Sequence, residues 1–428
     1  MDTIFALASG QGRSGVAVVR ISGSLAFEVA QKLGGHVPDS HRVALRTLRD
    51  LDGAILDQAL VLPFRSPKSF TGEDVVELHL HGSIAVANAV QSCLLNLDGV
   101  RVAEAGEFTR RALENGKLDL TQIEGLADLI DAETEVQRVQ AQRVLTGKLT
   151  QKIENWRAAL IRAAALIEAT IDFADEDVPT DVMPEVDQLL RSVEKDLKTE
   201  IAGSAIAERV RSGFEVAIVG APNVGKSTLL NALANRQAAI TSKYAGTTRD
   251  VIEVRMDLKG LPVTLLDTAG IRESDDEVEQ VGVARAIQRA EDADLRIFLV
   301  EDGSDVPIPA RSGDVVRKPK ADLREVSDFA ISGLTGQGLS ELIEEVQETL
   351  SQRAAKSSLA IRERHRLAME KALQHVFKAR EQLDKVATTE DMLAEDLRHV
   401  VRGLEVLIGR VDVENLLDEI FASFCIGK

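Results

Sequence analysis

The first part of the chain alternates between short apolar runs and turns. Residues 16–21 form one apolar run, and residues 74–80 alternate between apolar and polar side chains. The apolar members of this second run fall on one face and the polar members on the other: Val76, Leu78 and Leu80 against Glu77 and His79. Such alternation is typical of strands with one buried face. Glycine and proline punctuate residues 1–118, so this region is expected to be an α+β domain.

From about residue 119 the apolar positions recur every three or four residues, which predicts helices with one buried face. Two stripes precede residue 212: Ile153, Trp156, Leu160, Ala163, Ile167 and Ile171, then Val186, Leu189, Leu190, Val193, Leu197 and Ile201. Two more follow residue 357: Met392, Val400, Leu404 and Leu407, then Leu416, Leu417, Ile420 and Phe421. The acidic break at 172–179 is expected to be a solvated linker.

Between the helical segments the pattern of apolar and polar residues changes. An apolar strand at 214–219 runs into a glycine-rich turn, and strand and helix signals then alternate to about residue 353. That alternation predicts a parallel α/β sheet. The fold class is therefore a multidomain α/β chain: an α+β domain at 1–118, helical parts at 119–211 and 357–428, and an inserted α/β domain at 212–356. A length of 428 residues is consistent with about three domains.

Composition narrows the function classes. The formal net charge is −18 and aromatic residues are 3% of the chain, which argues against non-specific coating of nucleic acid and against broad base-stacking platforms. Cys93 and Cys425 are far apart and form no CxxC pair, so neither a disulfide framework nor a zinc site is expected, and a reducing cytoplasm fits. No signal peptide is visible, and no apolar run approaches the ~18 residues of a membrane span.

The turn after the 214–219 strand carries the strongest chemical signal. Residues 220–228 read GAPNVGKST, which matches the phosphate-loop pattern GxxxxGK[ST]. Glycines let backbone N–H groups surround phosphates at a helix N-terminus. Lys226 would reach the β- and γ-phosphates, and the Ser227 hydroxyl would ligate Mg²⁺.

Two further elements follow in the order that a nucleotide hydrolase needs. DTAG at 267–270 ends a strand at 262–266, where Asp267 suits the second shell of Mg²⁺ and the mobile glycine suits sensing of the γ-phosphate. GTTRD at 246–250 lies between the two motifs, and a threonine hydroxyl of this loop would complete the Mg²⁺ shell. DTAG alone would be weak evidence for a nucleotide hydrolase, but the three motifs in this order are strong evidence for one.

The base-recognition element departs from the expected Asn-Lys-x-Asp pattern. Here Pro319 precedes Lys320 and Asp322. Asp322 can accept two hydrogen bonds from guanine N1 and N2, and Lys320 can lie over the ring, but Pro319 supplies no carboxamide. The loop between strands at 295–300 and 314–317 also leaves no room for the usual helix. We therefore expect weaker or less selective guanine binding, with GTP favoured over ATP because Asp322 has no obvious use with adenine.

Four stretches together resemble one family over the whole chain. They are DTI at 2–4, the segment from Gly12-Arg13 to the RISG at 20–23, the phosphate loop, and FCIGK at 424–428. SFTGED at 69–74 adds to them. These sequences resemble the MnmE family, also called TrmE, of tRNA wobble-uridine modification GTPases.

The resemblance implies a K⁺-stimulated GTPase that works with an MnmG-type flavoprotein as a heterotetramer, with FAD bound only by that partner. Together they add an aminomethyl or carboxymethylaminomethyl group to C5 of the wobble uridine, position 34, of certain tRNAs. A reduced folate, 5-formyl- or 5,10-methylene-tetrahydrofolate, supplies the one-carbon unit from the N-terminal domain. That domain also makes the homodimer, and no membrane is involved.

The resemblance also carries residue roles. The K⁺ ligands would be Asn223, Ser242, Tyr244 and Thr247; the Mg²⁺ ligands Ser227 and Thr248; and the folate contacts Arg20, Glu77, Lys117 and Lys428. The nucleotide contacts would be Asn223, Val224, Gly225, Lys226, Ser227, Thr228, Ser242, Thr247, Thr248, Asp267, Thr268, Ala269, Gly270, Lys320 and Asp322. Glu279 would orient the attacking water, although spacing alone does not separate it from Glu277. Cys425 would be a functional thiol.

Plainer interpretations stand beside these roles. Cys425 can be a packed small side chain, Arg20, Glu77 and Lys117 can form structural ion pairs, and Cys93 is expected to be structural. His79 and His81 share a strand face but lack the further ligands of a metal site. The RERHR run at 362–366 is either a solvated helix face or a tRNA contact. For the whole chain, the alternatives are a regulatory switch in RNA or ribosome assembly and a nucleotide-binding scaffold with impaired GTP selectivity.

Overall fold

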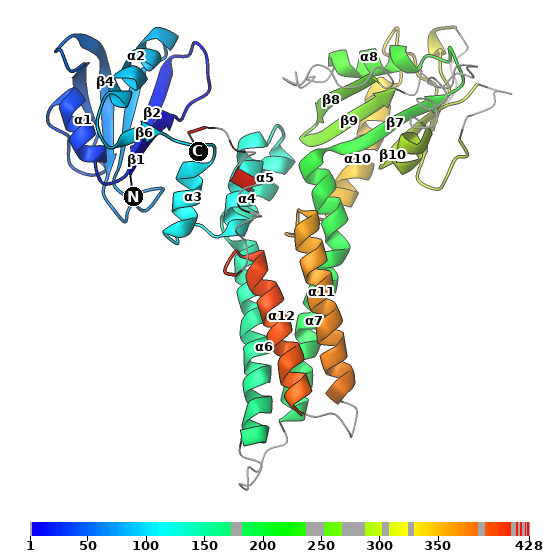
Figure 1. Ribbon diagram of the computed structural model, residues 1–428. Helices are drawn as coiled ribbons and strands as arrows, with labels where there is room; N and C mark the ends of the chain where they lie inside the picture. Colours follow the sequence, from blue (N-terminus) through cyan, green and yellow to red (C-terminus); the bar gives the residue numbers. More distant parts are fainter. Residues whose placement is uncertain are drawn as a thin grey trace, which may run out of the picture. The chain divides into compact units, whose positions relative to one another are not determined.

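The computed structural model describes residues 2–172, 182–236, 252–267, 287–301, 308–323, 329–383, 390–411, 417, 420–421, 424 and 426–427. Two compact units account for the fold (Figure 1): Met1–Ala127 with Glu405–Lys428, and Asp128–Leu404. The four-part division at 118, 211 and 356 stays a prediction. No helix in the described ranges has the length and apolar character needed to cross a membrane.

A six-stranded sheet organises the first unit, in the order β3-β4-β5-β2-β1-β6. The strands are β1 (Thr3–Leu7), β2 (Val16–Ser22), β3 (Ala44–Arg49), β4 (Ile55–Phe64), β5 (Val75–His81) and β6 (Val100–Val102). All pairs are antiparallel except β1 with β6. Helices α1 (Ala26–Gly34) and α2 (Ile84–Leu95) pack on the sheet through a shared apolar core. The predicted alternation along β5 is confirmed, because its apolar side chains are buried while Glu77 and His79 are only half-buried.

The end of the chain returns to this unit, beside α3 (Glu107–Glu114) and α4 (Leu120–Asp131). Phe421 and Phe424 pack with Ile123, and Ile426 forms an antiparallel bridge with Ala105. The predicted inward positions of Leu417, Ile420 and Phe421 are therefore confirmed.

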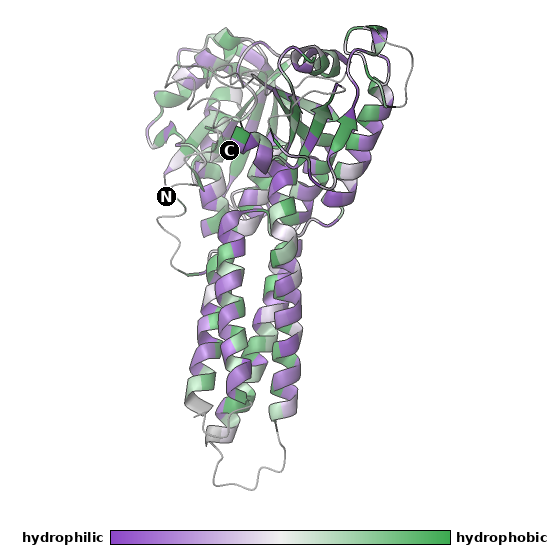
Figure 2. Ribbon diagram, turned by 90° about the vertical axis from the view of Figure 1, so that its right-hand side faces the viewer, coloured by the Kyte–Doolittle hydropathy of each residue, from purple (hydrophilic) through white to green (hydrophobic). Residues whose placement is uncertain are grey.

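Long helices form part of the second unit. They are α5 (Glu135–Leu145), α6 (Lys148–Asp172), α7 (Met183–Ser212), α11 (Glu363–Leu383) and α12 (Glu390–Leu407). The predicted seams of α6 and α7 are confirmed except that Leu189 and Ile201 are only half-buried, while the side chain of Ile171 lies outside the described residues. Figure 2 shows green apolar stripes along helices that are otherwise purple. The prediction for Met392 is wrong, because its side chain is 58% exposed and Leu393 takes the buried position. Leu393 lies two full turns before Val400, whereas eight residues separate Met392 from Val400 and rotate it off the seam.

The same unit contains a five-stranded sheet in the order β11-β10-β7-β9-β8. Its strands are β7 (Phe214–Gly220), β8 (Ile252–Leu258), β9 (Leu261–Asp267), β10 (Leu295–Leu299) and β11 (Val315–Arg317). All neighbours are parallel except β8 with β9. Helices α8 (Lys226–Arg236) and α10 (Leu339–Ala354) contribute to its core. The predicted α/β class of this region is confirmed. In the sequence, the region lies between the long helices α7 and α11.

Charged side chains hold the described part of the connection from β10 to β11. That part, residues 300–301 and 308–314, contains no helix. Instead the buried Arg296 guanidinium donates to the Asp314 carboxylate at 2.6 and 2.9 Å. Arg311 closes the turn by donating to the carbonyls of Glu291 and Ala293. Residues 302–307 lie outside the described residues, so the lack of the usual helix in the whole connection stays a prediction.

Candidate functional site

The phosphate loop lies where strand β7 ends and helix α8 begins. Asn223 and Gly225 have φ of 61° and 112°, so the chain reverses through left-handed conformations just before the helix. Gly220 must lack a side chain, because a Cβ there would lie 2.6 Å from the Leu299 carbonyl oxygen. The resulting turn leads into a helix N-terminus, the arrangement that binds phosphate through backbone N–H groups.

Lys226 is held inside this loop. Its side chain is buried, and its ammonium donates to the carbonyls of Gly220 at 2.9 Å and Ala221 at 3.0 Å. These contacts place a positive charge at the mouth of the loop rather than in bulk solvent. A charge positioned there would meet β- and γ-phosphates, as predicted.

Ser227 and Asp267 meet across the loop. The Ser227 hydroxyl donates to the Asp267 carboxylate at 2.7 Å, and Asp267 is buried at the end of β9. The two residues are 40 positions apart in sequence. A hydroxyl and a carboxylate beside a phosphate loop are the hard oxygen ligands that suit Mg²⁺. The residues present therefore fit the metal that the sequence predicts.

A cavity of about 290 Å³ adjoins the loop and includes Pro319, Lys320, Asp322 and Gly333 in its lining. The Ser332 hydroxyl donates to the Asp322 carboxylate at 2.5 Å. The Ser332 hydroxyl oxygen also accepts hydrogen bonds from the N–H groups of Leu334 and Thr335, each at 3.2 Å. Lys320 has φ of 58°, and its ammonium pairs with Glu301 at 3.1 Å. Asp322 is thus oriented by a loop that follows it by ten residues.

Gly333 lies in the Ser-Gly-Leu stretch at 332–334, which stands where the sequence places a base-contacting loop. A Cβ at this position would lie 2.9 Å from the Thr228 carbonyl group and 3.0 Å from the Leu229 nitrogen. The base-binding loop therefore packs directly on the backbone of α8. The Ser-Gly pair at 332–333 was the available signal, because a glycine there permits this close approach.

The folate contacts implied for the first unit are partly brought together. Arg20 donates to Glu77 at 2.9 Å, and its guanidinium lies 5.4 and 5.7 Å from the ring centroids of Phe70 and Phe108. Lys117 donates to the Pro67 carbonyl at 2.9 Å, on the loop that carries Phe70. These contacts are compatible both with structural ion pairing and with a site for a polar, ring-containing ligand.

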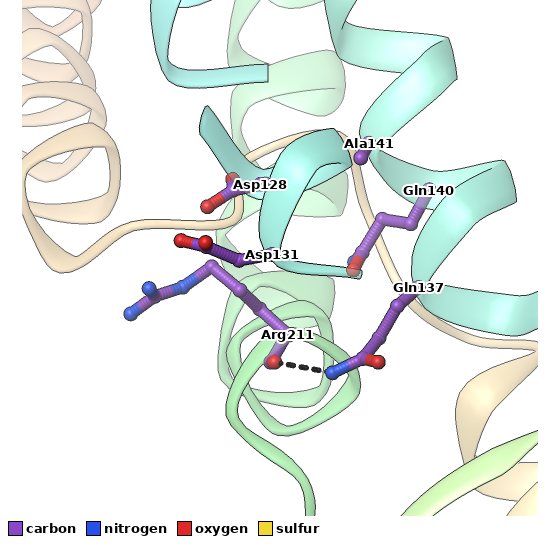
Figure 3. A pocket seen from close by; sticks show the side chains of 6 residues that line it. All are labelled: Asp128, Asp131, Gln137, Gln140, Ala141 and Arg211. Atoms are coloured by element: carbon purple, nitrogen blue, oxygen red, sulfur yellow. Dashed lines mark hydrogen bonds between the residues drawn. The ribbon is translucent and has the colours of Figure 1, made fainter. Parts of the chain in front are cut away.

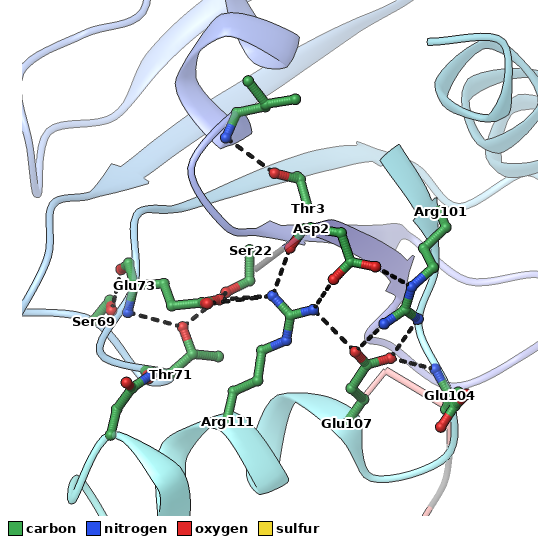
Figure 4. A network of polar contacts seen from close by, with 12 residues as sticks. Asp2, Thr3, Ser22, Ser69, Thr71, Glu73, Arg101, Glu104, Glu107 and Arg111 are labelled. Atoms are coloured by element: carbon green, nitrogen blue, oxygen red, sulfur yellow. Dashed lines mark hydrogen bonds and ion pairs between the residues drawn. The ribbon is translucent and has the colours of Figure 1, made fainter. Parts of the chain in front are cut away.

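An ion-pair network around the buried Arg111 supports the loop that carries Phe70, and no sequence pattern predicted it (Figure 4). The buried Arg111 guanidinium contacts Asp2 at 2.9 Å, Glu107 at 3.0 Å and Glu73 at 3.1 Å. Ser22 adds a 2.7 Å hydrogen bond to Glu73. Burial by itself raises the pKa of the Glu107 carboxyl, but hydrogen bonds, first that from Arg101, outweigh it and hold the pKa below its usual value. The network therefore anchors residues 69–74.

Other predicted residues have structural partners. Cys93 is buried in α2, as expected, and burial raises the pKa of its thiol. His79 contacts Glu77 and His81 contacts Asp57, and no metal-binding cluster occurs among the described residues.

The interpretation of the 362–366 run as a solvated face is wrong in part. His365 is fully buried, and Arg362 donates to Asp128 at 2.7 Å. Arg366 pairs with Glu363 and Glu370 along the same helix. Arg362 and Arg366 therefore stabilise α11 through ion pairs and contribute little unpaired positive charge to its surface.

A smaller cavity of about 80 Å³ lies at the end of α7 (Figure 3). Asp128, Asp131 and Arg211 are among its lining residues, and Gln137 donates to the Arg211 carbonyl at 2.8 Å. Its volume suits water molecules rather than a nucleotide.

Several predicted residues lie outside the described residues: Ser242, Tyr244, Thr247, Thr248, Thr268, Ala269, Gly270, Glu277, Glu279, Cys425 and Lys428. Most of the acidic linker at 172–179 and Leu416 also lie there. Their roles stay predictions.

Comparison with known proteins agrees across the whole chain. Residues 3–117 match the family described as GTP-binding protein TrmE N-terminus, and residues 120–425 match the MnmE helical domain. The tRNA modification GTPase MnmE of Roseobacter denitrificans is 61% identical over 428 residues, and that of Ruegeria sp. strain TM1040 is 59% identical, each alignment covering 100% of both chains. Among solved structures, the T. maritima FeoB cytosolic domain in its GMPPNP form is 17% identical with a TM-score of 0.24, covering 46% of this chain and 98% of that one, a likeness too weak to bear on the fold. On the family matches and the full-length identities, this chain belongs to the MnmE family of tRNA modification GTPases.

Proposed function

We propose that this chain hydrolyses GTP in the modification of the wobble uridine of tRNA. The observation that carries the GTPase part is the 2.7 Å contact between Ser227 and Asp267, with the ammonium of Lys226 held in the adjoining loop. These three groups are what phosphoryl transfer needs from the protein: a charge on the phosphates and oxygen ligands for Mg²⁺. The tRNA part rests on family membership.

The other residues of the nucleotide site have the following proposed roles. Val224, Gly225 and Thr228 complete the phosphate loop, and Thr248 joins Ser227 at Mg²⁺. Asn223, Ser242, Tyr244 and Thr247 hold K⁺. Thr268, Ala269 and Gly270 respond to the γ-phosphate, and Glu279 orients the attacking water. Bound in this way, K⁺ and Mg²⁺ would supply positive charge that stabilises the phosphates during hydrolysis.

The first unit is proposed to bind the reduced folate through Arg20, Glu77, Lys117 and Lys428. The ion-paired Arg20, lying against two aromatic rings, supports this role, because a folate presents both a flat ring and charged groups. The chain is proposed to act as a homodimer with an MnmG-type flavoprotein, which brings FAD, and with Cys425 as a functional thiol. The cytoplasm is the proposed location.

GTP hydrolysis is expected to be faster in KCl than in NaCl at equal ionic strength. The reason is that K⁺, with a larger radius than Na⁺, would fit a site built from Asn223 and the 242–247 loop. Turnover is measured by phosphate release from the purified full chain. Asn223→Ala should remove the difference between the salts, while Asn235→Ala, in the last turn of α8, should keep it. Equal rates in both salts for the unmodified chain would contradict the K⁺ role.

Arg20→Ala is expected to weaken binding of 5-formyltetrahydrofolate to the full chain by at least about tenfold, because a charged, hydrogen-bonded contact is lost. Titration calorimetry measures it. Arg49→Ala, on the edge strand β3, is the matched control and should bind normally. Unchanged affinity in the Arg20 variant would leave this residue a structural ion pair with Glu77.

A further inference from the structure

The cavity of about 290 Å³ beside the phosphate loop offers hydrogen-bond partners to only part of a guanine ring. Resting on the proposed function, we propose that this chain recognises guanine through N1, N2 and O6 and leaves N7 without a hydrogen bond, because Pro319 stands where the expected motif has asparagine. Guanine presents N1–H and N2–H₂ donors on one edge and O6 and N7 acceptors on the other. The two edges can therefore be considered separately.

The N1 and N2 edge has a prepared acceptor. Ser332 donates to Oδ1 of Asp322, which fixes the carboxylate plane and leaves Oδ2 and further lone pairs for the base. Ser332 is itself held by the N–H groups of Leu334 and Thr335. A carboxylate held in this way selects a base that carries an amino group at C2.

The backbone N–H of Gly333 is the donor assigned to O6. The Ser332 N–H donates to the Gln337 carbonyl, and those of Leu334 and Thr335 are used by the Ser332 hydroxyl. For the N–H of Gly333, which lines the cavity, the described residues provide no acceptor. Its backbone is pressed against α8, so its position relative to the phosphate loop is set.

Among the described lining residues, position 319 supplies no donor for N7. Pro319 lines the cavity but has neither a backbone N–H nor a polar side chain. The Lys320 ammonium is 3.1 Å from Glu301. The remaining polar lining residues, Asn223 and Thr228, belong to the phosphate loop and the start of α8.

The surrounding backbone explains why proline is tolerated at 319. Lys318 donates to the Phe329 carbonyl and accepts from Ile331, and Ala321 donates to the Ile331 carbonyl. None of these bonds calls for an N–H at 319, so proline costs no backbone hydrogen bond here. The same geometry should accept asparagine without disturbing the fold.

The test compares GTP, 7-deaza-GTP, ITP and ATP by titration of the full chain with Mg²⁺ and K⁺ present. 7-Deaza-GTP lacks only the N7 acceptor, and ITP lacks only the N2 amino group. The Kd of GTP and 7-deaza-GTP should agree within about twofold, and ITP should bind at least about tenfold more weakly because a hydrogen bond to a charged group is lost. Pro319→Asn should tighten GTP about fivefold and leave 7-deaza-GTP unchanged, since one neutral hydrogen bond is added. Pro319→Ala, the matched control, should create no such difference.

A 7-deaza-GTP Kd tenfold or more above that of GTP in the unmodified chain would overturn the proposal, as would a Pro319→Asn variant that folds but binds both nucleotides alike. If that variant does not fold, the comparison in the unmodified chain decides alone. Absence of GTP binding, or equal binding of GTP and ATP, would instead overturn the proposed function and this inference with it.

Discussion

Lys226→Ala is expected to lower kcat for GTP hydrolysis at least about 100-fold, the usual loss when a positioned group that stabilises transition-state charge is removed. The structure gives the reason. The ammonium is buried and held by the carbonyls of Gly220 and Ala221, so no solvent ion replaces it in the same place. Single-turnover phosphate release in saturating GTP and Mg²⁺ measures the chemical step.

Lys259→Ala is the matched control for this loss. Lys259 is a half-exposed lysine that pairs with Glu344 at 3.5 Å, away from the phosphate loop. It should hydrolyse GTP at the unmodified rate. A Lys226→Ala variant that keeps its thermal transition and hydrolyses GTP within a few-fold of normal would remove this lysine from the mechanism.

Asp314→Ala is expected to lower the free energy of opening of the β10–β11 region by about 3–5 kcal/mol, because it leaves the Arg296 guanidinium buried without its counter-charge. Both side chains of the pair are under 5% exposed. Hydrogen exchange of the β10 and β11 amides reports this region by itself, which matters in a chain with two units.

Glu135→Ala provides the comparison, since its pair with Arg138 is exposed to solvent and should contribute little to stability. Amide protection of β10 and β11 that is equal in the two variants would contradict a structural role for the Arg296–Asp314 pair.

The contribution of Asp314 should also depend on pH. Burial by itself raises the pKa of its carboxyl, but hydrogen bonds, first that from Arg296, outweigh it and leave the pKa below the usual value. A lowered folded pKa means that the stabilisation is complete above the unfolded pKa of about 3.9 and is lost as pH falls through the lower folded value. The difference in protection between the unmodified chain and Asp314→Ala should therefore be full at pH 7 and shrink in strong acid.

Sequence reasoning succeeded where the signal was local. The alternation in β5, the seams of α6 and α7, and the strand–loop–helix at Gly220 all depend on residues within a few positions of one another. It failed for Met392 because a stripe with one long gap admits two registers, and only the buried neighbour Leu393 distinguishes them. It misjudged His365 because a charged run tells nothing of the helix that will cover it.

What the sequence determined by itself is the set of elements and the phosphate chemistry: periodicity and motif spacing encode backbone conformation within one turn or one strand. Which side chains meet depends instead on the packing of the folded chain. Ser332 orients Asp322 from ten residues away, Arg296 finds Asp314 across 18, and Arg111 finds Asp2 across 109. Each such pairing depends on how strands and helices pack. From the sequence alone, a charged residue could pair with any residue of opposite charge, and packing decides which of them lies within contact distance.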